Sequence, residues 1–176
     1  MIFMPLQVTG ACILEPELFE DARGCFARTF CRNEFAAHGL VADYPQCSTS
    51  FNRRRGTLRG MHYQKAPHAE AKIVRVTAGS VFDVALDLRP GSSTYLKWSS
   101  AELTAENRRA FYIPPGCAHG FITLQDNTEM LYYMSEPFMA EYYCGARYND
   151  PAFGIKWPFA PEIINPRDAS YKDFEP

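Results

Sequence analysis

Short segments rich in β-branched and aromatic residues follow one another along the middle of the chain at hairpin spacing. Turn residues separate several of them, namely Gly79, Pro90-Gly91 and Asp126-Asn127. This regularity is typical of an antiparallel sandwich or barrel, and the aromatic share of 14% favours β structure around a lined pocket. We therefore predict an all-β fold whose main strands are residues 57–63, 72–78, 80–88, 96–103, 110–113, 120–124 and 128–134.

The two ends of the chain carry weaker signals. Residues 6–14 alternate weakly and predict a first strand, residues 25–30 predict a short strand, and residues 32–39 predict a short helix closed by glycine. The stretch from residue 148 onward is rich in Pro and Asp, and we expect irregular structure with short helical turns. A chain of 176 residues is long enough to bury a core without crosslinks, so residues 1–176 are expected to form a single domain.

Charge and composition exclude several classes of protein. The net charge of −2 gives no electrostatic reason to expect a nucleic-acid partner. No apolar run reaches membrane-spanning length, and the N-terminus lacks the pattern of a secretory signal. The six cysteines are scattered without a C-x-x-C pair, which is typical of reduced thiols in a cytoplasmic protein and does not favour a metal site.

Residues 56–64 (GTLRGMHYQ) place an arginine and a histidine between two glycines of an apolar run. Because side chains alternate along a strand, Arg59 and His62 are predicted to lie on opposite faces, with His62 on the small, apolar face that points into the interior. A second histidine, His119, stands in the run PPGCAHGF ahead of another short strand. Two interior histidines with basic neighbours indicate a proton-transfer pocket rather than a plain core.

Five polar residues fall on predicted interior strands or at their ends, where an unpaired charge is costly: Arg59, His62, Lys72, His119 and Tyr132. A histidine can act as a general base near neutral pH. Tyr132 can donate a proton, and Lys72 can stabilise a developing oxyanion. Arg59 and the basic turn 53–55 could hold a phosphate. Each residue taken singly is more often structural, and only the combination favours proton abstraction next to a ketone.

A metal site is the competing interpretation of the same pocket. His62, His68, Glu70 and His119 have side chains that suit a divalent cation, but the close His-x-His pair of many metal-binding barrels is missing. Lys72 would also supply a fixed positive charge in place of the ion. His68 and Glu70 fall in the turn 65–71, where exposure to solvent is expected.

Four motifs in order, GTLRGMHYQ, AKIVRVTAGSVFDVALDLRPGSSTY, PPGCAHGF and YNDPAFGIKWP, resemble the dTDP-4-dehydrorhamnose 3,5-epimerase family. The resemblance covers nearly the whole chain. It implies a cupin-like antiparallel jelly-roll barrel with short peripheral helices. It further implies a homodimer that exchanges N-terminal strands and needs no metal or cofactor. The implied substrate is a dTDP-4-keto-6-deoxy sugar, epimerised at C3 and C5 on the route to L-rhamnose.

The resemblance also assigns catalytic roles. His62 is similar to the base that removes the proton beside the ketone, and Asp168 to the carboxylate that orients it. Lys72, with His119 nearby, is similar to the group that stabilises the enolate. Tyr132 matches the tyrosine that protonates the opposite face of the sugar.

A second group of residues is implied to bind the substrate. Arg59 resembles the diphosphate-binding arginine. Phe19 and Arg23 match residues that reach the nucleotide, with the partner subunit as one source of them. Gln46 and Phe138 complete the predicted binding set.

Three departures from the family pattern bear on specificity. Phe138 stands where a tyrosine is common, and the missing hydroxyl could change how many centres are epimerised. Arg28 replaces a nucleotide-contacting glutamate of some members, and Cys47-Ser48-Thr49 replaces a polar Asp-Asn-His run. These differences bear on which nucleobase and which sugar are recognised, and not on the proton-transfer chemistry.

Three other functions stay open at this point. A keto-isomerase of related fold would use a histidine pair without a tyrosine acid, so Tyr132 argues against it. A single-centre epimerase acting at C3 or C5 of another nucleotide-linked sugar shares all the catalytic residues. A non-catalytic sugar-nucleotide-binding cupin is disfavoured by the complete set of His62, Lys72, Tyr132 and Asp168.

Overall fold

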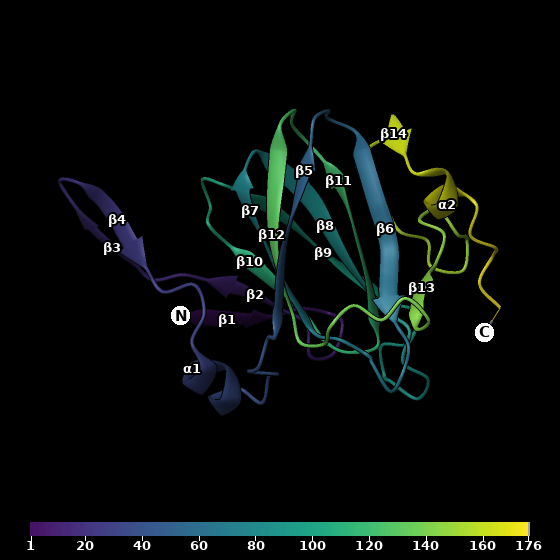
Figure 1. Ribbon diagram of the computed structural model, residues 1–176, viewed down its shortest axis with the longest axis horizontal. Helices are drawn as coiled ribbons and strands as arrows, with labels where there is room; N and C mark the ends of the chain where they lie inside the picture. Colours follow the sequence, from purple (N-terminus) through teal and green to yellow (C-terminus); the bar gives the residue numbers. More distant parts are fainter. Residues whose placement is uncertain (176) are drawn as a thin grey trace.

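Two β-sheets face each other in the structure, a computed structural model that describes residues 1–175 (Figure 1). Neighbouring strands are antiparallel except for one short parallel pair. The first sheet has the order β1 (Ile2–Pro5), β2 (Cys12–Glu15), β10 (Ala110–Ile113), β7 (Lys72–Ala78), β12 (Thr128–Met134) and β5 (Gln46–Asn52). The second has the order β13 (Tyr143–Gly145), β6 (Thr57–Gln64), β11 (Cys117–Thr123), β8 (Ser80–Asp87) and β9 (Trp98–Thr104).

Short elements complete the architecture. The parallel pair joins β14 (Ile163–Ile164) to β6. The hairpin β3 (Leu18–Asp21) and β4 (Gly24–Ala27) extends away from both sheets in Figure 1. Two helices, α1 (Arg32–Ala37) and α2 (Pro166–Ala169), lie at the periphery. The prediction of an antiparallel, cupin-like jelly roll with short peripheral helices is confirmed.

Two predicted strands near the N-terminus are confirmed only in part. Residues 6–14 form the turn that follows β1 and most of β2, because Gly10 at φ +83° reverses the chain and Leu6 N donates to Ala11 O. Of residues 25–30, only 25–27 belong to β4, which pairs with β3 across a turn. That turn is stabilised by Asp21, whose Oδ1 accepts a hydrogen bond from Arg23 N at 2.8 Å.

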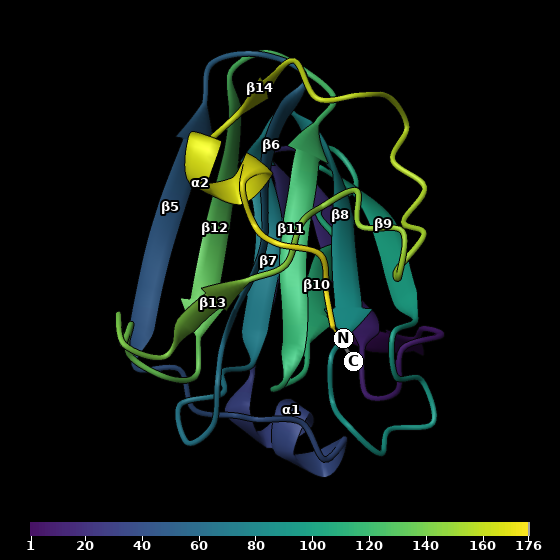
Figure 2. The ribbon, with the colours of Figure 1, turned by 90° about the vertical axis from the view of Figure 1, so that its right-hand side faces the viewer.

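Apolar side chains form three clusters. One fills the space between the sheets and includes Val74, Phe111 and Phe121. A second lies on the outer face of the first sheet around Phe35 of α1. A third lies on the outer face of the second sheet, where Phe153 packs against β6, β8 and β11 residues and the C-terminal segment crosses in Figure 2. Each sheet is therefore covered on its outer face, and the inner faces of the two sheets share one apolar interior.

A bulge in β6 corrects the predicted facing of Arg59 and His62. His62 pairs with His119 and Arg59 pairs with Phe121, so three steps along β6 match two steps along β11. Because residues two apart on a strand share a face, the extra residue brings Arg59 and His62 to the same interior side. Gly60, at φ +121°, permits the bulge, since a Cβ there would lie 2.5 Å from the Gly120 Cα.

Candidate active site

A histidine–aspartate pair joins β6 to the C-terminal helix. His62 Nε2 lies 2.8 Å from Asp168 Oδ1, and Asp168 Oδ2 accepts a hydrogen bond from Gly60 N at 3.2 Å. Asp168 is only 2% exposed. Its helix α2 is capped by Asn165, whose Oδ1 accepts a hydrogen bond from Arg167 N at 2.9 Å, and Pro166 occupies the first turn. This short capped helix holds the carboxylate against the imidazole.

The pair favours a neutral histidine with a free lone pair. An ionised carboxylate only accepts hydrogen bonds, so His62 Nε2 carries the proton and Nδ1 is the basic atom. Burial lowers the pKa of His62 below its usual 6.5, and this outweighs the opposing effect of Asp168. For Asp168, burial acts to raise the pKa, but the bonds from His62 and Gly60 outweigh it and leave the pKa below its usual value. His62 is thus suited to accept a proton near neutral pH.

A second histidine–aspartate pair lies beside the first. His119 is the register partner of His62, and its Nε2 lies 3.0 Å from both carboxylate oxygens of Asp83 on β8. Both side chains are buried, and burial raises the pKa of Asp83 although His119 opposes this. Sequence reasoning missed Asp83. The signal was present, because it is the one acidic residue of the apolar run SVFDVAL and alternates with interior residues Val81 and Ala85.

Lys72 begins β7 and reaches the same region from the first sheet. Its Nζ lies 2.9 Å from Glu70 Oε1 and donates to the His62 carbonyl oxygen at 3.3 Å. The expectation that Glu70 is exposed is wrong, since it is 8% exposed. The turn that carries Glu70 folds inward because its carboxylate pairs with the ammonium and accepts from Gln64 Nε2.

Tyr132 faces the histidines from the first sheet. It lies on β12, and its ring meets the His119 ring edge-on at a centroid distance of 5.9 Å. Burial raises its pKa, so the phenol stays protonated at neutral pH. A histidine on one sheet and a tyrosine on the other thus approach the interior from opposite sides.

Cationic side chains border the histidine. Arg59 Nε donates to Asn52 Oδ1 at 2.8 Å, which fixes one edge of an otherwise exposed guanidinium. A cavity of about 280 Å³ lies between β6 and residues 163–168, and Arg59, His62 and Arg167 line it. Two guanidinium groups beside one imidazole are suited to bind a phosphate-bearing ligand.

An aromatic wall connects the predicted binding residues Gln46 and Phe138 to His62. Gln46 Oε1 accepts a hydrogen bond from Phe138 N at 3.0 Å, and the centroids of the Phe138 and Tyr143 rings are 5.3 Å apart. The Tyr143 ring centroid lies 5.3 Å from that of His62, and the Arg167 guanidinium lies over the Tyr143 ring. Tyr143 was missed from the sequence, because a tyrosine in a run of aromatic residues carries no distinguishing pattern.

Phe19 and Arg23 do not join this site within one chain. Both lie on the β3–β4 hairpin, at the opposite end of the molecule from β6 and α2 in Figure 1. Phe19 is 69% exposed, and Arg23 forms an ion pair with its neighbour Asp21.

Comparison with known proteins identifies the family. A family model described as dTDP-4-dehydrorhamnose 3,5-epimerase matches residues 5–176. The chain belongs to this family. A family member from Methanothermobacter thermautotrophicus is 42% identical over 171 residues, which cover 97% of this chain and 90% of the relative.

Solved structures agree with this membership. A crystal structure of dTDP-4-dehydrorhamnose 3,5-epimerase from Elizabethkingia anophelis has a TM-score of 0.95 and 35% identity, covering 99% of this chain and 96% of the other. A crystal structure of a 3'-monoepimerase from Streptomyces bikiniensis in complex with dTDP-quinovose has a TM-score of 0.88 and 30% identity. The match covers 97% of this chain and 86% of the other. The epimerase fold therefore hosts both double and single epimerisation, and the fold match does not separate them.

The four residues of the alternative metal site are not brought together in this epimerase-family chain. His68 Nδ1 lies 3.3 Å from Glu136 Oε2, and Glu70 pairs with Lys72. Among residues 1–175, no three His, Cys, Asp or Glu side chains are placed to hold a metal ion. No helix in that range is long and apolar enough to cross a membrane.

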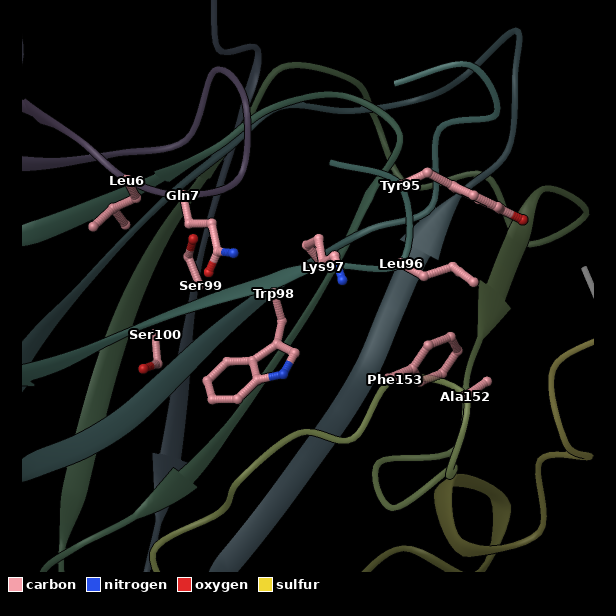
Figure 3. Close-up of a pocket in the computed structure, with 10 residues that line it drawn as sticks. All are labelled: Leu6, Gln7, Tyr95, Leu96, Lys97, Trp98, Ser99, Ser100, Ala152 and Phe153. Atoms are coloured by element: carbon pink, nitrogen blue, oxygen red, sulfur yellow. The ribbon is translucent and has the colours of Figure 1, made fainter. Parts of the chain in front are cut away.

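A larger cavity of about 720 Å³ lies away from the histidines, along β9 (Figure 3). Trp98, Ser99 and Ser100 of β9 line it together with Phe153. Lys97 is the one charged residue in its lining. With no acid–base pair, this cavity is not suited to proton transfer.

Proposed function

We propose that this chain epimerises a dTDP-4-keto-6-deoxy sugar at C3 and C5 by removing and returning a proton through an enolate. The observation that carries this function is the His62–Asp168 pair, with a free ring nitrogen on one sheet and Tyr132 on the other. Membership of the dTDP-4-dehydrorhamnose 3,5-epimerase family supports the same chemistry. The protein is thus an isomerase.

Each proton transfer has a candidate residue. His62 Nδ1 takes the proton from a carbon next to the C4 ketone, and the C–H electron pair moves into the enolate. Lys72, with His119 nearby, stabilises the negative oxygen. Tyr132 then donates its proton to the opposite face of that carbon, which inverts it. The imidazolium and the phenolate return to their starting states by exchange with water, so the reaction consumes no cofactor.

Substrate binding is assigned to the cationic and aromatic groups around His62. Arg59 and Arg167 line the cavity beside the base and are suited to the diphosphate. Phe138 is 58% exposed, and its backbone is fixed by Gln46, so its ring is available for a flat nucleobase or sugar face.

A homodimer completes the binding site in this proposal. The β3–β4 hairpin exposes Phe19 and Phe26, which are 69% and 74% exposed, far from the site of its own chain. Strand β5 is the last strand of its sheet, and Phe51 on its outer face is 52% exposed. An exposed apolar hairpin and an open sheet edge are complementary, so the hairpin of one subunit would bring Phe19 and Arg23 to the partner's site.

The proposed compartment is the cytoplasm. All six cysteines are free thiols, including the exposed Cys25 and Cys47. Free surface thiols are typical of proteins in reducing compartments.

Single-centre epimerisation is the second candidate, and Phe138 is the observation that favours it. Its ring packs against Tyr143, which packs against His62, so the missing hydroxyl lies two rings from the base. A substrate held by one hydrogen bond fewer could present only C3 or only C5 to His62. A non-catalytic sugar-nucleotide-binding protein is the remaining candidate outside the enzymes.

Proton exchange measured by NMR separates these functions. Incubation with dTDP-4-keto-6-deoxyglucose in deuterated water should remove the H3 and H5 signals of the sugar for a double epimerase. Loss of one signal would indicate a single-centre enzyme, and Phe138→Tyr would then be expected to restore the second exchange. His62→Ala should abolish exchange at both carbons. Tight nucleotide binding without any exchange would contradict the catalytic function.

A further inference from the structure

Glu70 is a buried carboxylate that the mechanism does not use. Its side chain is 8% exposed and that of Lys72 is 10% exposed, and Oε1 lies 2.9 Å from Nζ. We propose that Glu70 is a positioning residue that holds the Lys72 ammonium beside His62, where the enolate oxygen forms. It acts through Lys72 and does not contact the substrate.

Lys72 needs such a restraint because of its own flexibility. A lysine ammonium sits on a four-carbon stem with many rotamers and directs its three protons to whatever acceptors surround it. Here two acceptors fix it from neighbouring elements, namely Glu70 Oε1 and the His62 carbonyl oxygen at 3.3 Å. The second contact ties the ammonium to the residue that carries the base.

The carboxylate of Glu70 is itself held in place. Its Oε2 accepts from Gln64 Nε2 at 3.3 Å, and Gln64 Oε1 accepts from Met139 N at 2.6 Å. Gln64 Nε2 also donates to the carbonyl oxygens of His68 and Pro137. These bonds anchor the turn that carries Glu70 to β6 and to the segment next to Phe138, so the acceptor has a fixed position before substrate binds.

The other charged and titratable groups around the ammonium already have partners. His62 is bonded to Asp168, and both oxygens of Asp83 are occupied by His119. Tyr132 faces the same interior as a neutral phenol. Without Glu70, the ammonium would be drawn toward the buried Asp83 carboxylate, whose pKa burial raises and His119 and Lys72 act to lower, and away from the carbonyl of His62.

Two variants of Glu70 test this role, which rests on the proposed function of Lys72. Glu70→Met keeps the length but loses the acceptor. The displaced Lys72 ammonium would then lose its charged hydrogen bond to the enolate oxygen, which is made in the transition state, so kcat should fall about 10- to 100-fold with KM unchanged. Glu70→Gln keeps an acceptor oxygen and should retain kcat within about fivefold. Rates are taken from H3 and H5 exchange by NMR, per folded protein measured by circular dichroism.

A double-mutant cycle separates positioning from a structural role. If Glu70 acts only through Lys72, Glu70→Met should not lower kcat further in a Lys72→Met background. The Lys72→Met single variant should lower the melting temperature by leaving Glu70 unpaired, and the double variant should recover part of it. Additive losses of kcat would overturn the positioning role.

The outcomes also distinguish this inference from the proposed function. If Lys72→Met leaves exchange unchanged, the oxyanion role of Lys72 fails. If Lys72→Met lowers kcat and folded Glu70→Met does not, only the role of Glu70 fails. Should Glu70→Met not fold, Glu70→Asp replaces it. The shortened acid should then have a lower kcat than Glu70→Gln, and the reverse order would overturn the inference.

Discussion

Asp168 affects both the orientation and the protonation of His62, and the two effects predict different changes with pH. Burial lowers the pKa of His62 below 6.5, and Asp168 opposes that effect. The neutral base is lost as pH falls through the pKa of the free enzyme. The acid limb of kcat/KM should therefore have its midpoint below about pH 6.5.

Removing the Asp168 charge should move this midpoint further down. In Asp168→Asn the stabilisation of the imidazolium is lost, so the pKa of His62 falls and the acid limb shifts to lower pH. The plateau should drop about 10²- to 10⁴-fold, because the amide no longer fixes the correct tautomer. A pH profile of kcat/KM for both proteins checks this. An acid limb that moves to higher pH in Asp168→Asn would contradict the assignment of His62 as a buried neutral base.

Tyr132 is assigned to one proton transfer only, and its replacement should separate exchange from inversion. In Tyr132→Phe the base is intact, so His62 still removes the proton and can return a deuteron to the same face. Deuterium should therefore enter the sugar while little inverted product forms. NMR of the sugar configuration and of H3 and H5 loss measures both. Tyr112→Phe is the matched control, since Tyr112 is a buried tyrosine, 2% exposed, on the outer face of the first sheet.

At the scale of elements, the sequence predicted the strands of the barrel well and their facing less well. Strands β7, β10 and β12 have the predicted bounds, and β6, β8 and β9 differ by one or two residues at an end, because alternation and turn residues are local signals. Strand β11 begins three residues before its predicted start. The bulge in β6 was not predictable, since one extra residue depends on the partner strand β11. The burial of Glu70 was missed for the same reason, because its partners Lys72 and Gln64 lie on separate strands.

The bulge makes a prediction about Gly60. A Cβ at this position would lie 2.5 Å from the Gly120 Cα and 2.8 Å from the His119 carbonyl oxygen, and backbone atoms cannot move aside easily. Gly60→Ala should therefore lower the free energy of unfolding by about 2–4 kcal/mol. It should also reduce activity, because Arg59 and His62 flank the bulge.

Gly91→Ala is the matched control for this effect. Gly91 also has a positive φ, of +82°, but nothing lies within 4 Å of its Cβ position. Its replacement should cost about 1 kcal/mol, from the backbone conformation alone. Urea unfolding at one fixed protein concentration measures both variants. Equal losses in the two variants would show that close packing of β6 against β11 is not what Gly60 provides.

At the scale of the whole molecule, the site depends on parts of the chain that meet only in the folded state. Asp168 lies 106 residues beyond His62, and α2 reaches β6 only because the C-terminal segment crosses the second sheet (Figure 2). No local pattern distinguishes this aspartate from a solvated one, so only the family resemblance pointed to it. His62, His119, Lys72 and Tyr132, to which the proposed function assigns catalysis, could by contrast be selected from residue type and their positions on predicted strands.

The β3–β4 hairpin predicts a site that is completed by a second molecule. If Arg23 serves the partner's site, Arg23→Ala and His62→Ala should each inactivate their homodimers. Mixing the two proteins under conditions that exchange subunits should restore activity. One site of each heterodimer then has His62 from the Arg23→Ala chain and Arg23 from the His62→Ala chain.

The size of the recovery follows from the symmetry of the dimer. Random exchange makes half of the dimers mixed, and one of two sites in each is intact, so about a quarter of the wild-type activity should return. Mixing His62→Ala with Asp168→Asn is the control, because both residues belong to the same chain's site. Its heterodimers contain no intact site and should stay inactive. If the Arg23→Ala mixture also stays inactive although heterodimers form, Arg23 acts within its own chain or not at all.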